Sequence, residues 1–156
     1  MREIKFRAFI KKFKVMSDVW QLIYACFDNK KLQSVCTAIS FTNIGCNFKA
    51  DEIELMQFTG LKDKNGVDVY EGDVVSMHQF LFDGNEVERE TSGVVSYSNE
   101  MACFILTKIK SKFYEEFTGY KSGEGVAAIC DFCGLHEETW TVLGNIYEGI
   151  SNANRD

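Results

Sequence analysis

The sequence predicts a mainly β protein, made of many short strands that form a small barrel or a sandwich. Three observations support this prediction. Apolar and polar residues alternate over short stretches, which is the period of a strand with one buried face. Gly and Asn residues separate these stretches, and the chain contains no proline. The 13 Phe, six Tyr and two Trp residues supply enough large apolar side chains for a core.

The first 41 residues contain three stretches with this character. Residues 4–9 alternate and predict a strand, which the lysine-rich turn 11–14 ends. Residues 19–27 leave two alternatives open, because their apolar residues fall at helical spacing while their β-branched and aromatic content favours a strand. We prefer the strand, because the turn residues 28–31 and a second β-favouring stretch, residues 32–41, follow it.

The strongest local signal is Asn65-Gly66, since both residues accept the positive φ angles of a tight primed hairpin turn. Valine-rich stretches predict strands on either side of a second turn, residues 71–73. Glutamates alternate with other residues over 86–90, so a strand there has one charged face.

The second half continues the pattern. Residues 93–97 and 102–109 predict a hairpin, and residues 110–125 predict a loop or a short helix. Residues 139–143 predict the last strand. The polar tail 151–156 has no apolar pattern.

The net charge of −6 is unevenly distributed along the chain. Residues 1–50 contain nine Lys and Arg against three Asp and Glu, whereas residues 51–156 contain eight against twenty. Three interpretations remain open: a solvated surface without a partner, a basic lobe that docks on an acidic lobe within or between chains, and a basic face for nucleic acid.

The first residues alternate charged and apolar side chains, which is not the pattern of a secretory signal, and no stretch reaches 18 apolar residues. We therefore expect a cytoplasmic protein. In that reducing compartment the six cysteines are expected to stay free thiols.

Four sequence blocks carry a resemblance to a known family. They are REIKFRA at residues 2–8, LMQFTGLKDKNGVDVYEGDVV at 55–75, GVVSY at 93–97 and VLGNIYEG at 142–149. In order and spacing these blocks resemble the YopX family of phage and prophage proteins. The sequence departs from the family where it usually reads FRAWD, because Phe9-Ile10 follow Ala8 here. Segments 15–50 and 107–139 have no counterpart among the blocks.

The resemblance implies a small, mainly β protein with an SH3-like barrel, made in a bacterial host cell, and without an established biochemical activity. We expect one YopX-like domain over residues 1–150, with an additional N-terminal β (or α+β) lobe at 1–54, an SH3-like barrel lobe at 55–150, and the polar tail. The family motifs place the following residues in scaffold roles: Gly60, Asn65, Gly66, Tyr70, Gly72, Asp73, Gly144, Asn145 and Tyr147.

The strongest chemical pattern is Cys130, Cys133 and His136, since two thiolates and an imidazole at this spacing suit three corners of a zinc tetrahedron. A strong zinc signal has a second paired motif, which the sequence lacks, so we expect ordinary loop cysteines and no metal or other cofactor. Neither His78 nor His136 lies in a known catalytic motif. We therefore name no catalytic residue and expect that the protein is not an enzyme.

Two functional hypotheses follow. The first is a protein-interaction module that binds a bacterial or phage protein or forms a homo-oligomer, with no membrane partner. The second is a nucleic-acid-binding barrel that uses the basic N-terminal region. Its phosphate contacts would come from Lys11, Lys12, Lys14, Lys30 and Lys31, and its stacking aromatic from Phe9, Phe13 or Trp20.

Overall fold

The fold comes from a computed structural model of the 156-residue chain. The structure describes residues 3–24, 32–38, 45–82, 86–110, 121, 123, 125–128 and 140–150. Within these ranges no helix is long and apolar enough to cross a lipid bilayer.

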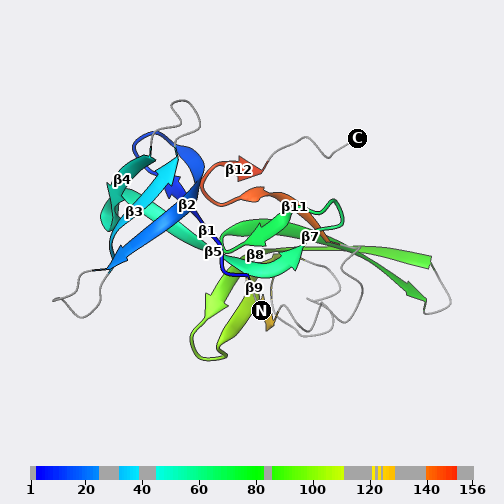
Figure 1. The fold of residues 1–156 in the computed structure, drawn as a ribbon. Helices are drawn as coiled ribbons and strands as arrows, with labels where there is room; N and C mark the ends of the chain where they lie inside the picture. The colour runs from blue at the N-terminus through cyan, green and yellow to red at the C-terminus, as the bar shows by residue number, and fades with distance from the viewer. Residues whose placement is uncertain are drawn as a thin grey trace. The chain divides into compact units, whose positions relative to one another are not determined.

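The described residues are almost all in β-strands (Figure 1). The strands are β1 (Phe6–Ile10), β2 (Val15–Tyr24), β3 (Leu32–Ala38), β4 (Gly45–Lys49), β5 (Ile53–Lys62), β6 (Asp68–Tyr70), β7 (Asp73–Phe82), β8 (Glu86–Ser98), β9 (Cys103–Lys110), β10 (Gly125–Ala128), β11 (Trp140–Asn145) and β12 (Gly149–Ile150). One 3-10 turn, η1 (Ala50–Glu52), joins β4 to β5. The strands form two sheets, in the orders β4-β3-β2-β1-β5-β6 and β10-β9-β8-β7-β11-β12.

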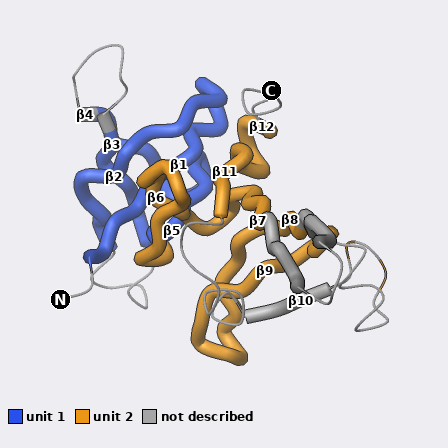
Figure 2. The backbone as a smooth tube through the Cα atoms, turned by 90° about the vertical axis from the view of Figure 1, so that its right-hand side faces the viewer, with its two compact units in different colours: residues 1–58 blue, residues 59–156 orange. Residues whose placement is uncertain are grey.

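The chain divides into two compact units, residues 1–58 and residues 59–156, which Figure 2 colours separately. The boundary lies inside β5, so this strand ends unit 1 and begins unit 2. Each unit has its own core of buried apolar side chains. The core of unit 1 is Ala8, Ile10, Val35 and Ile53, and that of unit 2 is Val69, Val75, Met77, Val95, Phe104, Leu106, Ile109 and Trp140.

Strand β2 bends the sheet of unit 1. Residues 15–18 pair with β1 and residues 19–24 with β3. Trp20 is an extra residue between Val19 and Gln21, whose partners on β3, Thr37 and Cys36, are consecutive. Such a β-bulge bends a strand and shifts the alternation of its side chains by one position. Val19 and Leu22 therefore both pack against the core, although they are three residues apart. This register shift explains why residues 19–27 have helical spacing while residues up to Tyr24 form the strand that we preferred.

The loop from Asp63 to Val67 differs from the two-residue primed turn that we predicted. Gly66 has φ 80, whereas Asn65 is not among the residues with positive φ. The Gly66 N–H donates to the Asp63 carbonyl (2.9 Å), and the Asp63 N–H donates to the Val67 carbonyl (2.8 Å). These bonds define a three-residue hairpin loop that ends in a left-handed glycine. Its conformation is set by the Asp63 side chain, described below, rather than by an Asn-Gly pair.

The mainly β prediction is confirmed, and strands are found at most of the predicted positions. The SH3-like barrel is not confirmed, because the pairings among the described residues leave both sheets open. In unit 1, buried side chains from β1, β3 and β5 form one core. The turn at 28–31, most of the loop at 110–125 and the tail at 151–156 lie outside the described residues.

A buried hydroxyl in unit 1 yields a stability prediction. The Thr37 side chain is 0% exposed, and its Oγ1 has no hydrogen-bond partner among the described residues. Burying an unsatisfied hydroxyl costs free energy that an isosteric methyl does not. We expect Thr37→Val to raise the free energy of unfolding by about 1 kcal/mol, measured by urea denaturation.

Thr59→Val is the matched control. The Thr59 Oγ1 donates to the Val69 carbonyl (2.8 Å) and accepts from the Leu61 N–H (3.1 Å). This variant should therefore lower the free energy of unfolding by roughly 1–2 kcal/mol. A loss of stability in Thr37→Val as large as that in Thr59→Val would show that the Thr37 hydroxyl is satisfied in solution.

Candidate interaction surface

The Asp63 carboxylate is a buried hydrogen-bond acceptor in unit 2. Asp63 is 6% exposed. Its Oδ1 accepts from the N–H groups of Asn65 (2.8 Å) and Val67 (2.9 Å), and its Oδ2 accepts from the Val142 N–H (3.2 Å). Burial raises the pKa of this carboxyl, but the three backbone N–H groups lower it further, so its pKa lies below the ordinary value of 3.8. The charged carboxylate therefore connects the hairpin loop to β11 through these hydrogen bonds.

A second buried carboxylate lies in the turn between β6 and β7. Asp73 is 0% exposed, and its Oδ2 accepts from the Tyr70 N–H (2.8 Å). In the same turn the Gly72 N–H donates to the Val95 carbonyl (2.8 Å), and the Gly72 carbonyl accepts from the Ile146 N–H (3.0 Å). The turn therefore bonds to β8 and to the loop that follows β11.

The loop between β11 and β12 is held by Asn145 and requires a glycine. The Asn145 Oδ1 accepts from the N–H groups of Tyr147 (3.0 Å) and Glu148 (2.8 Å). Gly144 has φ 148, and a Cβ atom there would lie 2.2 Å from the Gly149 carbonyl oxygen. No larger residue fits at this crossing without moving the backbone.

These contacts place the family-motif residues in turns and strand crossings. Gly60, the remaining one, has φ 94 on β5, and a Cβ atom there would have no described neighbour within 4 Å. Within the described ranges, no group of three or more His, Cys, Asp and Glu side chains could hold a metal ion. Cys130, Cys133 and His136 lie outside the described residues.

The turn between β1 and β2 presents an aromatic ring between two exposed lysines. Phe13 is 48% exposed, and its ring meets that of Phe48 on β4 edge-on, with the centroids 6.3 Å apart. The Lys12 ammonium lies 5.4 Å from the centroid of the Phe13 ring. The N–H groups of Phe13 and Lys14 both donate to the Ile10 carbonyl, at 3.2 and 2.8 Å. The turn is therefore held by the backbone and supported from β4.

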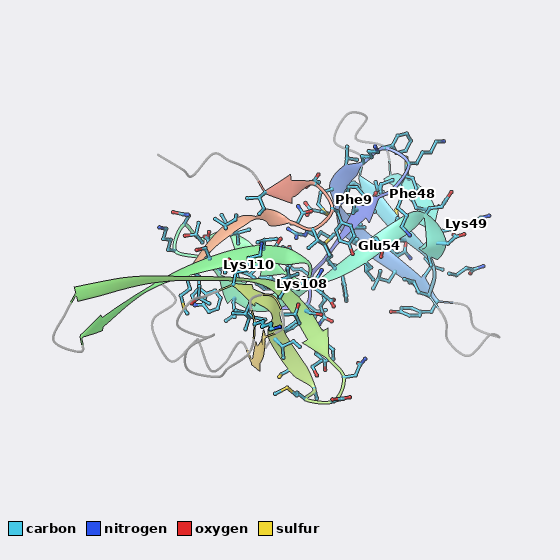
Figure 3. The ribbon with its side chains drawn as sticks, turned by 180° about the vertical axis from the view of Figure 1, so that it is seen from behind. Phe9, Phe48, Lys49, Glu54, Lys108 and Lys110 are labelled. Carbon is cyan, nitrogen blue, oxygen red and sulfur yellow. The ribbon has the colours of Figure 1, made fainter. Side chains whose placement is uncertain are left out.

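The end of β4 carries another exposed lysine, Lys49. Lys49 directly follows Phe48 (Figure 3), and its backbone N–H donates to the Glu52 Oε2 (2.8 Å). No ion pair of Lys12, Lys14 or Lys49 is found in the part of the chain that the structure describes. We call Lys12, Phe13, Lys14 and Phe48 the basic tip.

The lysines that we predicted as nucleic-acid contacts differ in whether a carboxylate balances their charge. The Lys11 ammonium lies 2.8 Å from the Glu54 Oε1 and donates to the Asp51 carbonyl (3.0 Å), so a carboxylate already balances its charge. Lys12 and Lys14 are exposed in the basic tip. Lys30 and Lys31 lie outside the described residues.

The three aromatic candidates for stacking also differ in exposure. Trp20 is 62% exposed and occupies the extra position of the β2 bulge, whereas Phe9 on β1 is partly buried. Phe13 belongs to the basic tip. Trp20 therefore presents the most accessible ring of the three, on a strand whose neighbouring residues Val19 and Leu22 are anchored in the core.

The sequence analysis did not identify Phe48 as part of this surface. Its stretch, Gly45–Lys49, has neither a motif nor a lysine run, and only the edge-on contact between the Phe13 and Phe48 rings places Phe48 beside the turn. The available signal was weak: a single aromatic residue near the end of a short strand.

Comparisons with known proteins reveal one family. The family model described as YopX protein matches residues 5–150. Among solved structures, the chain is similar to the crystal structure of protein EF1440 from Enterococcus faecalis, at 22% sequence identity and a TM-score of 0.55. The match covers 95% of this chain and 96% of that chain, and at this identity it shows a common fold. No curated protein matches the sequence.

The Asp63 contacts predict how stability responds to substitution and to pH. We expect Asp63→Asn to lower the free energy of unfolding by roughly 2 kcal/mol, because an amide carries no charge and has only one acceptor atom for three N–H groups. The folded-state pKa is depressed, so the contribution of the carboxylate is complete above the unfolded pKa and is lost as the pH falls through the folded pKa.

Urea unfolding at pH 7 and at several pH values below 4 tests both statements. The wild type should lose more stability on acidification than Asp63→Asn, because the variant lacks this titrating group. Asp51→Asn, at an exposed carboxyl on η1, is the control and should behave like the wild type. Equal acid sensitivity of the wild type and Asp63→Asn would contradict the assignment.

Proposed function

The chain belongs to the YopX family, and from that premise we propose that it is a phage- or prophage-encoded accessory protein that acts as a non-enzymatic protein-interaction module. We place its activity in the cytoplasm of a bacterial host cell. The proposal is supported chiefly by one observation, the exposed side chain of Trp20 on the β2 bulge.

An exposed tryptophan on a rigid strand is suited to anchor a partner protein. Trp side chains are enriched among the residues that carry most of the binding energy at protein interfaces, because they bury a large area at low entropic cost. A bulge aims a side chain in a direction that regular pairing would not allow. The packing of Val19 and Leu22 into the core holds this part of β2 in place before any partner binds.

The SH3-like barrel is part of the proposal. It is supported by the bend at Trp20, which lets β1, β3 and β5 share one core. The sequence led us to expect the barrel at residues 55–150, and the bulge at Trp20 belongs to the unit of residues 1–58. Barrel folds serve many unrelated functions, so the functional argument depends on the surface and not on the fold.

Nucleic-acid binding is the second candidate, supported by the arrangement of Phe13 between Lys12 and Lys14. An exposed ring with flanking ammonium groups suits stacking on a base and contact with phosphates. The balance of the Lys11 charge by Glu54 and the net charge of −6 both weaken this alternative.

Affinity capture with wild-type and Trp20→Ala baits from lysates of phage-infected or prophage-induced bacteria tests the proposal. We expect a specific protein to be retained by the wild type and reduced at least about tenfold with Trp20→Ala, since interface anchors cost 2 kcal/mol or more on truncation. Trp20→Ala should fold normally, because the ring is mostly exposed.

Met101→Ala is the control bait, since Met101 is 55% exposed in the turn between β8 and β9 of unit 2. It should retain the same protein as the wild type. Titration with single- and double-stranded DNA and RNA at two salt concentrations tests the second candidate, because phosphate-driven binding weakens steeply with salt. Salt-sensitive nucleic-acid binding together with no captured protein would favour that candidate over the interaction module.

A further inference from the structure

The Asn65-Gly66 pair in the loop between β5 and β6 is chemically reactive as well as turn-forming. The backbone nitrogen of Gly66, once it has lost its proton, attacks the side-chain carbonyl carbon of Asn65. The new C–N bond forms as the bond to the amide nitrogen breaks, and ammonia leaves. Water then opens the resulting succinimide ring to aspartate or isoaspartate. Glycine permits this attack because no side chain shields its nitrogen. Both residues are exposed, so water and hydroxide reach them.

Hydrogen bonds hold both reacting groups in the folded loop. The Gly66 N–H, whose proton must leave before the attack, donates to the Asp63 carbonyl (2.9 Å). The Asn65 amide nitrogen, which is the leaving group, donates to the Asp63 Oδ2 (3.4 Å). The reaction therefore has to break the hydrogen bond of the nucleophile and to release the nitrogen by which Asn65 contacts Asp63.

The backbone around the pair is also fixed. The N–H groups of Asn65 and Val67 donate to the Asp63 Oδ1, at 2.8 and 2.9 Å, and the Lys64 N–H donates to the Trp140 carbonyl (3.0 Å). Ring closure changes the backbone dihedral angles of the pair, and these bonds resist that change. Loss of the amide proton would also place a negative charge near the buried carboxylate of Asp63, and like charges repel strongly where water is excluded.

The product of the reaction does not fit the closed loop. An aspartate at position 65 sets a second carboxylate against the Asp63 Oδ2, where an amide nitrogen otherwise donates, and these two acceptors of like charge repel. Isoaspartate lengthens the backbone between the N–H groups that bind Asp63. Because Asp63 also accepts from the Val142 N–H (3.2 Å), loss of the loop geometry weakens the bond to β11.

We propose that Asn65 is a deamidation site that the closed loop protects, and that its conversion prevents the loop from closing again. Molecules whose loop stays closed keep the amide, whereas molecules whose loop opens are covalently altered at the contact with β11. The reaction thereby limits how long an opened chain remains able to regain its fold. This inference goes beyond the proposed function, because it involves neither Trp20 nor a partner protein.

Peptide mass spectrometry of the full chain measures the reaction. Wild-type protein and a synthetic peptide of residues 61–69 are incubated in the same mildly alkaline buffer. Fragmentation locates the exchange of the amide for a carboxyl group at Asn65, and enzymatic methylation detects isoaspartate. We expect the folded chain to react at least about tenfold more slowly than the peptide, because the reaction proceeds only through the open loop. Equal rates in the protein and the peptide overturn the proposal.

A pair of variants tests whether Asp63 provides the protection. Asp63→Ala removes the acceptors of the loop and should raise the rate at Asn65 at least about tenfold. Val95→Ala is the matched control, because it destabilises the core of unit 2 on β8 and leaves the loop bonds in place. It should react near the wild-type rate. Equal acceleration in the two variants overturns protection by the loop. If Asp63→Ala does not fold, Asp63→Ser replaces it.

The consequence of deamidation is tested with Asn65→Asp, which carries the product side chain. We expect its equilibrium constant for unfolding in urea to exceed that of the wild type by at least about fivefold, because two carboxylates then meet in the loop. Asn99→Asp adds the same charge in the exposed turn between β8 and β9 and should match the wild type. Equal stability of Asn65→Asp and Asn99→Asp overturns the inference that conversion keeps the loop open.

Discussion

The architecture of unit 2 depends on the buried carboxylate of Asp63. One of its oxygens closes the β5–β6 loop, and the other accepts from the Val142 N–H, 79 residues later in the chain. A buried charge is tolerated only when hydrogen bonds replace its water, and here three backbone N–H groups do so. The carboxylate thus joins a hairpin of the first sheet to β11 of the second sheet.

This contact gives a physical reason for two sequence blocks of the family to occur together. The block at 55–75 contributes Asp63 and Gly72, and the block at 142–149 contributes the backbone N–H groups of Val142 and Ile146 that bind them. Gly144 allows the chain to cross within contact distance of Gly149. The two blocks therefore form one structural junction, and their residues are explained by hydrogen bonding and close packing.

In unit 1 the corresponding constraint is the shared strand β2. Residues 15–18 of β2 pair with β1 and residues 19–24 pair with β3, and the bulge at Trp20 within the second segment bends the strand and shifts its alternation. The core gains Val19 and Leu22 on one side, while the indole of Trp20 stays in solvent on the other. The same distortion thus builds the core and exposes the ring to which we assign partner binding.

The uneven charge along the chain follows the division into two units, with a basic excess in residues 1–58 and an acidic excess in residues 59–156. Their opposite charge balance was visible in the sequence, which left three interpretations open. The position of Lys11 beside Glu54 removes one lysine from the basic surface, and the contact between the Phe13 and Phe48 rings joins the turn to β4.

The sequence by itself determined the mainly β class, the turn at Lys11–Lys14 and most strand positions, because alternation and turn residues act between neighbours in the chain. It left residues 19–27 open, since a bulge shifts the alternation and imitates helical spacing. Only the tertiary structure decided that Asp63 binds Val142, that Phe48 lies beside Phe13, and that Trp20 is the extra residue of a bulge. These features arise from pairings between distant segments, which no local pattern encodes.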